Sequence, residues 1–208
     1  GMQNPYWVLY RNVFQNKRDR YMMNANLSYD VLDWLNLTGR VRLDNANVKD
    51  TQKNYATTDK LFSGDNGRFR SGMGVDKQLY ADFLANIKKY WEDVSLSANI
   101  GTSITDIWSE SQAADGFLLI PNFFGIKNID RTAPKTSIDQ GCYHEQTQSV
   151  FANVEVGWRS MLYLTLTGRN DWASALAKTK NSSFFYPSVG LSGILTEMMS
   201  KPKFISYM

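Results

Sequence analysis

Apolar and polar side chains alternate with a period of two between residues 149 and 197. Small or branched apolar residues take every second position up to Trp158, and leucines do so again from Leu162 to Leu166. The apolar positions are Val150, Ala152, Val154, Val156, Trp158, Leu162, Leu164 and Leu166. Because successive strand residues point to opposite faces of a sheet, this spacing predicts a β-hairpin with one apolar and one polar face. Its turn is expected at residues 158–160.

The same alternation occurs earlier in the chain and predicts two more hairpins. One joins segments 21–29 and 35–43, and the other joins segments 79–87 and 94–100. A further strand is predicted between residues 186 and 195, with Pro187 near its start, where a missing amide donor does least harm. Its apolar positions are Val189, Leu191 and Leu195. The pattern therefore predicts an all-β antiparallel meander of roughly seven strands, each about ten residues long.

The expected connections between these strands fall into two classes. Short turns are predicted at residues 30–33, 91–93 and 158–160, and long polar loops at residues 45–76, 102–148 and 170–183. Within the second loop, residues 116–121 are expected to form a short strand or a packed turn. Short turns at one end and long loops at the other are typical of a transmembrane β-barrel, whereas a soluble sandwich mixes loop lengths at both ends.

Large amphipathic rings flank each predicted short turn. They are Tyr29, Trp34, Tyr90, Trp91, Trp158 and Tyr163. Trp and Tyr favour the membrane interface, because the ring prefers the acyl boundary while its N–H or O–H group stays in contact with water. We therefore interpret these six residues as candidate membrane-interface aromatics. Ordinary packing within a sheet is the alternative reading.

Composition excludes several classes of protein. Apolar residues make up 43% and charged residues 21%, so extensive disorder is not expected. The formal net charge is +3, and the basic residues are scattered rather than gathered in the stripe expected for nucleic-acid binding. Cys142 is the single cysteine, so the chain forms no internal disulfide. No apolar run approaches the length of a membrane-spanning helix.

Candidate catalytic and metal-binding groups are sparse. Cys142, His144 and Glu145 are close in sequence, but successive strand residues alternate faces, and no second donor cluster completes a zinc site. Asp106 and Glu110 form an acid pair of the kind a glycosidase uses, but no pattern places them across a cleft. We expect no catalytic residues, no metal site and no cofactor.

Five sequence strings resemble the barrel of SusC/RagA-type TonB-dependent transporters of Bacteroidota. They are NPYWVLYRN at 4–12, DWLNLTGR at 33–40, VFAN at 150–153, MLYLTLTGRNDW at 161–172 and NSSFFYPSV at 181–189. The combination of LTGRNDW with the following FFYPS is the most specific of these matches. The resemblance extends over nearly the whole chain but covers a minor part of a full family member.

This resemblance implies a segment of a 22-stranded outer-membrane barrel. Residues 1–208 are expected to be a partial barrel, without the plug, the TonB-contacting segment and the C-terminal strands. The full protein would import a glycan or a peptide, in polysaccharide or other nutrient uptake, under a SusD-like lipoprotein and with energy transmitted through TonB. The segment would not transport anything alone.

The alternation and the resemblance together suggest an orientation. The tight turns are expected on the periplasmic side and the long loops outside, where ligand and lipoprotein meet. Asn170, Asp171 and Trp172 are expected to begin one such loop, where an indole can stack on a sugar ring and the polar pair can bond its hydroxyl groups. Closure of the loop against its neighbours is the alternative role for this cluster.

Two other functions share parts of the pattern. A soluble β-sandwich carbohydrate-binding module would need a second sheet to cover the apolar face, and it would bury the turn-flanking Trp side chains in one core. A glycosidase fragment would need an acid pair in a cleft. An incomplete barrel also has two strand edges with unpaired backbone groups, so the isolated chain is expected to self-associate or to curl in water.

Overall fold

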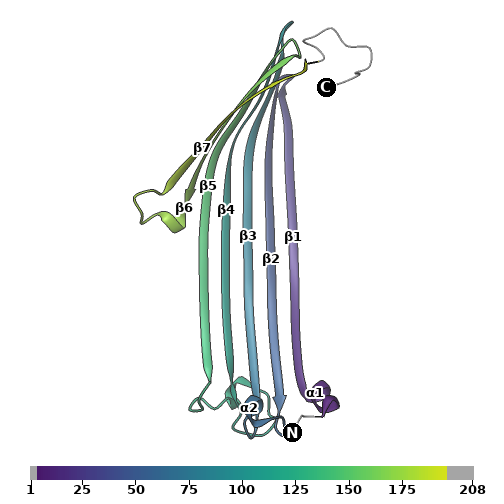
Figure 1. The fold of residues 1–208 in the computed structure, drawn as a ribbon, viewed down its shortest axis with the longest axis vertical. Coiled ribbons are helices and arrows are strands. Elements are labelled where there is room, and N and C mark those ends of the chain that lie inside the picture. The colour runs from purple at the N-terminus through teal and green to yellow at the C-terminus, as the bar shows by residue number, and fades with distance from the viewer. Residues whose placement is uncertain (1–3, 196–208) are drawn as a thin grey trace. The chain divides into compact units, whose positions relative to one another are not determined.

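The computed structural model describes residues 4–195 of the 208-residue chain, in which seven strands form one sheet in the order β1 to β7 (Figure 1). Each strand is hydrogen-bonded to the next one in the chain, so the sheet is an antiparallel meander that does not close. The strands are β1 (Asn12–Leu32), β2 (Leu35–Tyr55), β3 (Gly67–Tyr90), β4 (Val94–Phe117), β5 (Ser137–Trp158), β6 (Leu162–Ala173) and β7 (Ser183–Gly193). The all-β fold class expected from the sequence is confirmed.

The described chain divides into two compact units, and β1 to β5 contribute residues to both. The first unit comprises residues 4–22, 44–78 and 107–144, and the second comprises residues 23–43, 79–106 and 145–195. Among the described residues, no helix has the length and apolar character needed to cross a membrane.

The first unit contains the loop ends of β1 to β5 and two short helices, α1 (Pro5–Arg11) and α2 (Lys60–Ser63) (Figure 1). Each helix begins at a capping side chain: Asn4 accepts a hydrogen bond from the Tyr6 amide, and Asp59 from the Leu61 amide. The β4–β5 connection includes the 3₁₀ turn η1 (Ile126–Asn128). This connection helps to form the small core of the unit, which consists of Phe69, Ala114, Leu118 and Ile129 with Phe124 packed against it.

The second unit contains the three tight turns, the strands β6 and β7, and the 3₁₀ turn η2 (Ser174–Leu176). Its register places Val154 opposite Leu166 and Val156 opposite Leu164 across β5 and β6. Across β6 and β7, Val189 lies opposite Leu166, and Leu191 lies opposite Leu164. Directly opposed residues share a face of a sheet, so the predicted apolar face exists and continues over all three strands.

Strand lengths differ from the sequence prediction. Strands β1 to β5 have 21 to 24 residues each, about twice the expected length. The predicted loops 45–76 and 102–148 were too long, because most of their residues extend β2, β3, β4 and β5. These extensions mix polar residues, glycines and scattered apolar residues, so the alternation on which the prediction depended is interrupted. Cross-strand ion pairs such as Arg68–Asp115 link them instead.

Two finer predictions also change. Pro187 is the fifth residue of β7 rather than its first, a position that is tolerated because β7 is an edge strand of the described sheet. Residues 116 and 117 end β4, after which Leu118 forms a bridge with Ile129, close to the packed turn expected at 116–121. The sequence at 203–208 also predicts the beginning of a strand, and it lies outside the described residues.

Candidate membrane interface and loop-end polar cluster

The tight turns of the second unit bring aromatic rings and cations together. The Lys89 ammonium lies 5.6 Å from the ring centroids of both Trp34 and Trp91, and the Arg159 guanidinium lies 5.0 Å from that of Trp158. Arg159 also joins the last two turns, because its backbone amide donates to the Asp93 carbonyl at 2.7 Å and its side chain pairs with the Asp93 carboxylate at 3.2 Å. Indole and cation groups at one level are typical of a membrane–water interface.

The hydrogen bond and the charge of Asp93 raise the pKa of the Arg159 guanidinium above its ordinary value. Arg159 and Ser160 adopt positive φ angles of 51° and 56°. A positive φ at two successive residues is typical of the type I′ turn, which matches the twist of the strands it joins. The turn therefore keeps its cation next to the indole at all ordinary pH values.

The six aromatic residues proposed from the sequence do not all share one face. Tyr29, Trp34, Tyr90, Trp91 and Trp158 are exposed, and Tyr163 is half-buried. Tyr163 lies opposite Gly157 on the polar face of β5 and β6. Tyr90 also occupies a polar-face position of β3, two residues after Lys88. The interface role of the six stays a prediction.

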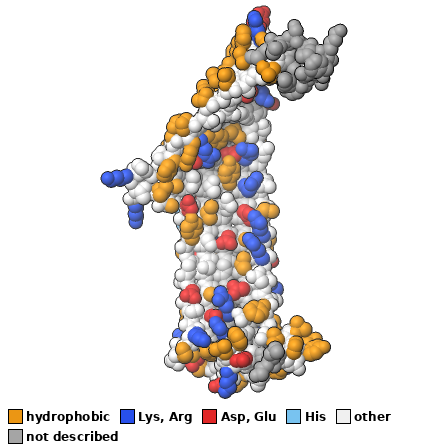
Figure 2. Space-filling model, in the orientation of Figure 1, with side chains coloured by type: hydrophobic (Ala, Val, Ile, Leu, Met, Phe, Trp, Pro, Cys, Tyr) orange, Lys and Arg blue, Asp and Glu red, His pale blue; other side chains and the backbone are white. Residues whose placement is uncertain are grey.

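The apolar face of β5, β6 and β7 is uncovered in the described part of the chain. Leu166 is 44% exposed, Val189 72% and Leu191 76%. Figure 2 shows hydrophobic side chains running along this part of the sheet. Soluble monomers rarely leave such a continuous apolar surface in water, and large exposed patches usually contact a protein partner or a membrane. The Trp side chains at the turns are likewise exposed, in contrast to the single buried core that a soluble sandwich requires.

The opposite face of the second unit is polar and hydrogen-bonded. Asn36 donates to Ser28 at 2.9 Å and to Asp30 at 2.7 Å, and Asn86 donates to Asn36 at 3.1 Å. These side chains come from β1, β2 and β3, so the amides form a ladder across three neighbouring strands. Such a ladder satisfies the hydrogen-bonding groups of these polar side chains.

An ion pair lies farther along the same polar face. Arg40 on β2 forms a two-pronged contact with Asp82 on β3, with distances of 2.9 Å and 2.8 Å, and the Tyr80 hydroxyl donates to Asp82 at 2.7 Å. The Asp82 side chain has no exposed surface, whereas that of Arg40 is 51% exposed. A groove of about 330 Å³ beside the pair is lined by Asn24, Asn26, Arg40, Arg42, Tyr80 and Asp82 among others.

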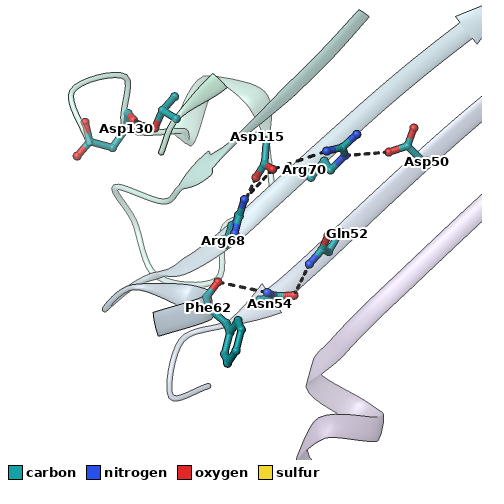
Figure 3. Close-up of polar contacts among 9 residues, drawn as sticks. Asp50, Gln52, Asn54, Phe62, Arg68, Arg70, Asp115 and Asp130 are labelled. Carbon is teal, nitrogen blue, oxygen red and sulfur yellow. Dashed lines mark hydrogen bonds and ion pairs between the residues drawn. The ribbon is translucent and has the colours of Figure 1, made fainter. Parts of the chain in front are cut away.

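The first unit has its own polar cluster at the loop ends of β2, β3 and β4 (Figure 3). Arg68 binds Asp115 with two parallel hydrogen bonds of 2.8 Å, and Arg70 lies 3.3 Å from Asp50 and 3.9 Å from Asp115. The hydrogen bond to Asp115 raises the pKa of the Arg68 guanidinium. With the charges of both signs matched in this way, we interpret the cluster as a cross-strand clamp that also presents polar groups to solvent.

Neighbouring side chains connect this clamp to the loops. The Asn54 amide donates to the Phe62 carbonyl, and the Asn128 amide donates to the carbonyls of Ile120 and Phe123 at 2.8 Å (Figure 3 shows the first contact). Asp130 accepts hydrogen bonds from the Thr132 hydroxyl at 2.7 Å and the Thr132 amide at 2.9 Å. These donors stabilise the ionised carboxylate and lower the pKa of Asp130.

The proposed ligand-facing residues lie within a strand. Asn170, Asp171 and Trp172 belong to β6, which ends at Ala173, so their placement at the start of a loop is wrong. Asn170 and Trp172 share the apolar face, whereas Asp171 lies on the polar face and pairs with Arg169 at 2.7 Å. Asn170 and Ser183 exchange hydrogen bonds of 2.9 Å and 3.0 Å. The three side chains therefore do not converge on one ligand.

The other chemical candidates do not assemble either. Within residues 4–195, no group of three or more His, Cys, Asp or Glu side chains is arranged to hold a metal ion. Cys142 is exposed in β5. Asp106, half of the proposed acid pair, accepts a hydrogen bond from Gln146 at 3.2 Å.

Two clusters were not singled out by sequence reasoning, namely Arg40–Asp82–Tyr80 and Arg68–Arg70–Asp115. Arg40 and Asp82 occupy polar positions of strands that were predicted, so each residue was on the expected face. Their pairing depends on the register between β2 and β3. The 11-residue connection between these strands contains no sequence pattern that predicts this register.

Comparison with known proteins relates this sheet to transporter barrels. A solved structure of the RagAB peptide transporter matches 99% of this chain and 23% of its own chain, with a TM-score of 0.86 and 16% identity. The RagAB peptide importer in the "open-open" state matches the whole chain and 22% of its own, with a TM-score of 0.82 and 18% identity. The chain thus spans less than a quarter of the length of these proteins.

A siderophore receptor is less similar to this chain in both structure and sequence. The siderophore receptor PiuA from Acinetobacter baumannii matches 85% of this chain and 29% of its own, with a TM-score of 0.51 and 11% identity. No family model and no curated protein sequence matches the chain. Identities this low show the fold alone, an open antiparallel sheet similar to a part of the barrels in these solved structures. The structural resemblance expected from the sequence strings is confirmed.

Proposed function

We propose that this chain is a wall segment of an outer-membrane importer of the SusC type. The observation that carries the proposal is the exposed apolar face of β5, β6 and β7, which lies back to back with a polar, hydrogen-bonded face. Lipid covers the apolar face and the import passage lies along the polar one, as in membrane barrels whose strands alternate apolar-out and polar-in. A soluble carbohydrate-binding sandwich is less well supported, because the described strands form one sheet.

The two ends of the strands have different roles in this proposal. The tight turns with Trp34, Trp91 and Trp158 lie at the periplasmic interface, where their rings and the cations Lys89 and Arg159 meet lipid headgroups. The longer connections between the strands lie outside, where substrate and partner arrive. The clamp at Arg68 and Asp115 maintains the shape of that outer wall.

The substrate and partners follow from the same proposal. RagAB is a peptide transporter, which supports import of a peptide, and a glycan is the other substrate class of SusC-type proteins. The complete protein would act with a SusD-like lipoprotein, receive energy through TonB and serve nutrient uptake in a Bacteroidota outer membrane. The segment itself has no catalytic role.

The proposal treats residues 1–208 as a partial barrel that depends on further strands of a longer protein. Its exposed apolar face and its two strand edges make the isolated chain self-associate in water. Sedimentation without detergent should show oligomers that dissociate when detergent is added. A monodisperse monomer without detergent would contradict this part of the proposal.

Uptake by cells tests the function of the complete protein. Cells that lack the gene containing this segment should lose uptake of a fluorescent oligopeptide mixture or an oligosaccharide mixture, and the gene in trans should restore it. Removal of TonB should abolish uptake to the same extent. Unchanged uptake of both mixtures, with the protein absent from the outer-membrane fraction of wild-type cells, would overturn the proposal.

A further inference from the structure

The apolar face of β5, β6 and β7 ends at a defined row of residues. Trp172 lies opposite Gln148 on β5 and Ser183 on β7, and Asn170 lies opposite Val150 and Phe185. Directly opposed residues share a face, so Trp172 and Phe185 lie on the same face as Val150, Leu166 and Val189. Beyond Val150, the next two residues of β5 on this face are Gln148 and Gln146, which are polar. On these strands of the second unit, the apolar surface therefore ends next to Trp172.

This row contains two aromatic side chains, Trp172 and Phe185, and two polar ones, Asn170 and Ser183. Trp172 is 42% exposed and Phe185 is 65% exposed. The Phe185 ring approaches Gly168, where a Cβ would lie 3.4 Å from it, so the ring fills the gap that a glycine leaves in the apolar face. Next to them, Asn170 and Ser183 satisfy each other's hydrogen bonds. Aromatic and polar side chains placed together in this way are suited to a membrane–water interface.

The height of the apolar band matches one membrane. Trp158 ends β5 at the tight turn, and Gln148, opposite Trp172, lies ten positions earlier. Ten positions at about 3.3 Å each span about 33 Å along the strand. A strand tilt of about 40° reduces that length to a height of about 25 Å, which is the height of the apolar band in outer-membrane barrels.

We propose that Trp172 and Phe185 form the outer edge of a lipid-contacting band on β5, β6 and β7 whose inner edge is Trp158. This inference rests on the proposed function and deepens it, because it fixes the depth at which the sheet meets the bilayer. It assigns Trp172 to lipid headgroups rather than to an imported ligand. The occupant of this face is a lipid bilayer, since its span equals the hydrocarbon thickness and both ends carry amphipathic rings.

Fluorescence quenching by brominated lipids tests the inference. The 208-residue chain with Trp172 as its single Trp, the others replaced by Phe, is reconstituted in phosphatidylcholine vesicles brominated near the headgroup or near the chain end. Matched variants keep Trp158 alone or Trp7 alone. We expect headgroup-proximal bromines to quench Trp172 and Trp158 more strongly than deep bromines do, and neither lipid to quench Trp7, which lies on α1 outside the strands.

Quenching of Trp158 without quenching of Trp172 would overturn the inference and leave the proposed membrane location in place. Absence of quenching at both positions would overturn the proposed location and the inference with it. Because five replacements can disturb folding, the single variant Trp172→Phe provides a second measurement. It should lose part of the quenching by headgroup-proximal bromines that the unmodified chain shows, and an unchanged signal would count against the role of Trp172.

Discussion

The ring of Tyr163 lies over Gly157, the residue directly opposite it across β5 and β6. A Cβ at position 157 would lie 2.9 Å from the ring atom Cε1, and it would also collide with the Ser95 hydroxyl of β4. The absence of a side chain at Gly157 therefore lets an aromatic ring cover the strand backbone. This contact is a known means of fixing the register of neighbouring strands.

The first prediction follows from this contact. Gly157→Ala should displace Tyr163 and lower the free energy of unfolding by about 1–3 kcal/mol. The control is Gly39→Ala, because a Cβ at Gly39 meets no atom within 4 Å, and it should be neutral or slightly stabilising. Urea titration in lipid or detergent, followed by Trp fluorescence, measures both variants. Equal effects would show that the ring does not depend on the glycine.

Part of this architecture was predictable from the sequence and part was not. Leu162, Leu164 and Leu166 alternate with polar residues, so their common face followed from strand geometry alone. The outer half of β3 has a weaker signal: between residues 67 and 76 only Phe69, Met73 and Val75 are apolar, and Ser71 interrupts their alternation. Phe69 is buried whereas Met73 is exposed, so burial along this segment is irregular, and pairing with β2 and β4 makes it a strand.

For the candidate site residues too, features that are local in sequence were predictable and contacts between distant strands were not. Trp158 and Tyr163 flank the turn at residues 158–160, a feature that is local in sequence and was predictable. The contact between Asp82 and Arg40 of another strand depends on long-range register and was not predictable.

The second prediction concerns this buried carboxylate. Arg40→Gln should destabilise the sheet because it leaves Asp82 without its cation, although by less than the roughly 3–5 kcal/mol of a fully buried pair, since the Arg40 side chain is half exposed. The double variant Arg40→Gln with Asp82→Asn should recover part of the loss. Tyr80→Phe should cost about 1 kcal/mol, the value of one hydrogen bond. A double variant weaker than the single one would contradict the pairing.

The third prediction concerns the core of the first unit. Leu118 is 3% exposed and packs with Phe69 and Ile129, whereas its neighbour Leu119 is 57% exposed. Leu118→Ala should open the β4–β5 connection and cost about 2–5 kcal/mol locally. Limited proteolysis should cleave this connection faster in Leu118→Ala and at the normal rate in the matched control Leu119→Ala. Equal cleavage of both variants would show that the core does not hold the loop.

The fourth prediction is a pH dependence in the same loop. The pKa of Asp130 is lowered by the two hydrogen bonds from Thr132, so its stabilising contribution is present above the ordinary Asp pKa of about 3.9. The contribution is lost as the pH falls through the lowered pKa of the folded state. The loop should therefore become more sensitive to pepsin as the pH falls from about 5 towards 2.

Asp130→Asn supplies the control for this pH effect, because an amide oxygen accepts the same hydrogen bonds but does not titrate. The ratio of cleavage rates between the native chain and this variant removes the pH dependence of the protease itself. We expect the ratio to rise as the pH falls. A constant ratio would mean that ionisation of Asp130 does not stabilise the loop.

The fifth prediction tests the central claim, which is that one face of this sheet contacts lipid and the other contacts water. Single cysteines placed in turn at positions 162 to 167 of β6, in a Cys142→Ser background, carry a nitroxide spin label in reconstituted bilayers. Collision rates with oxygen, which concentrates in lipid, should be high at Leu162, Leu164 and Leu166, whereas those with a water-soluble nickel complex should be high at Tyr163, Thr165 and Thr167. A uniform profile along β6, or the opposite phase, would contradict the account.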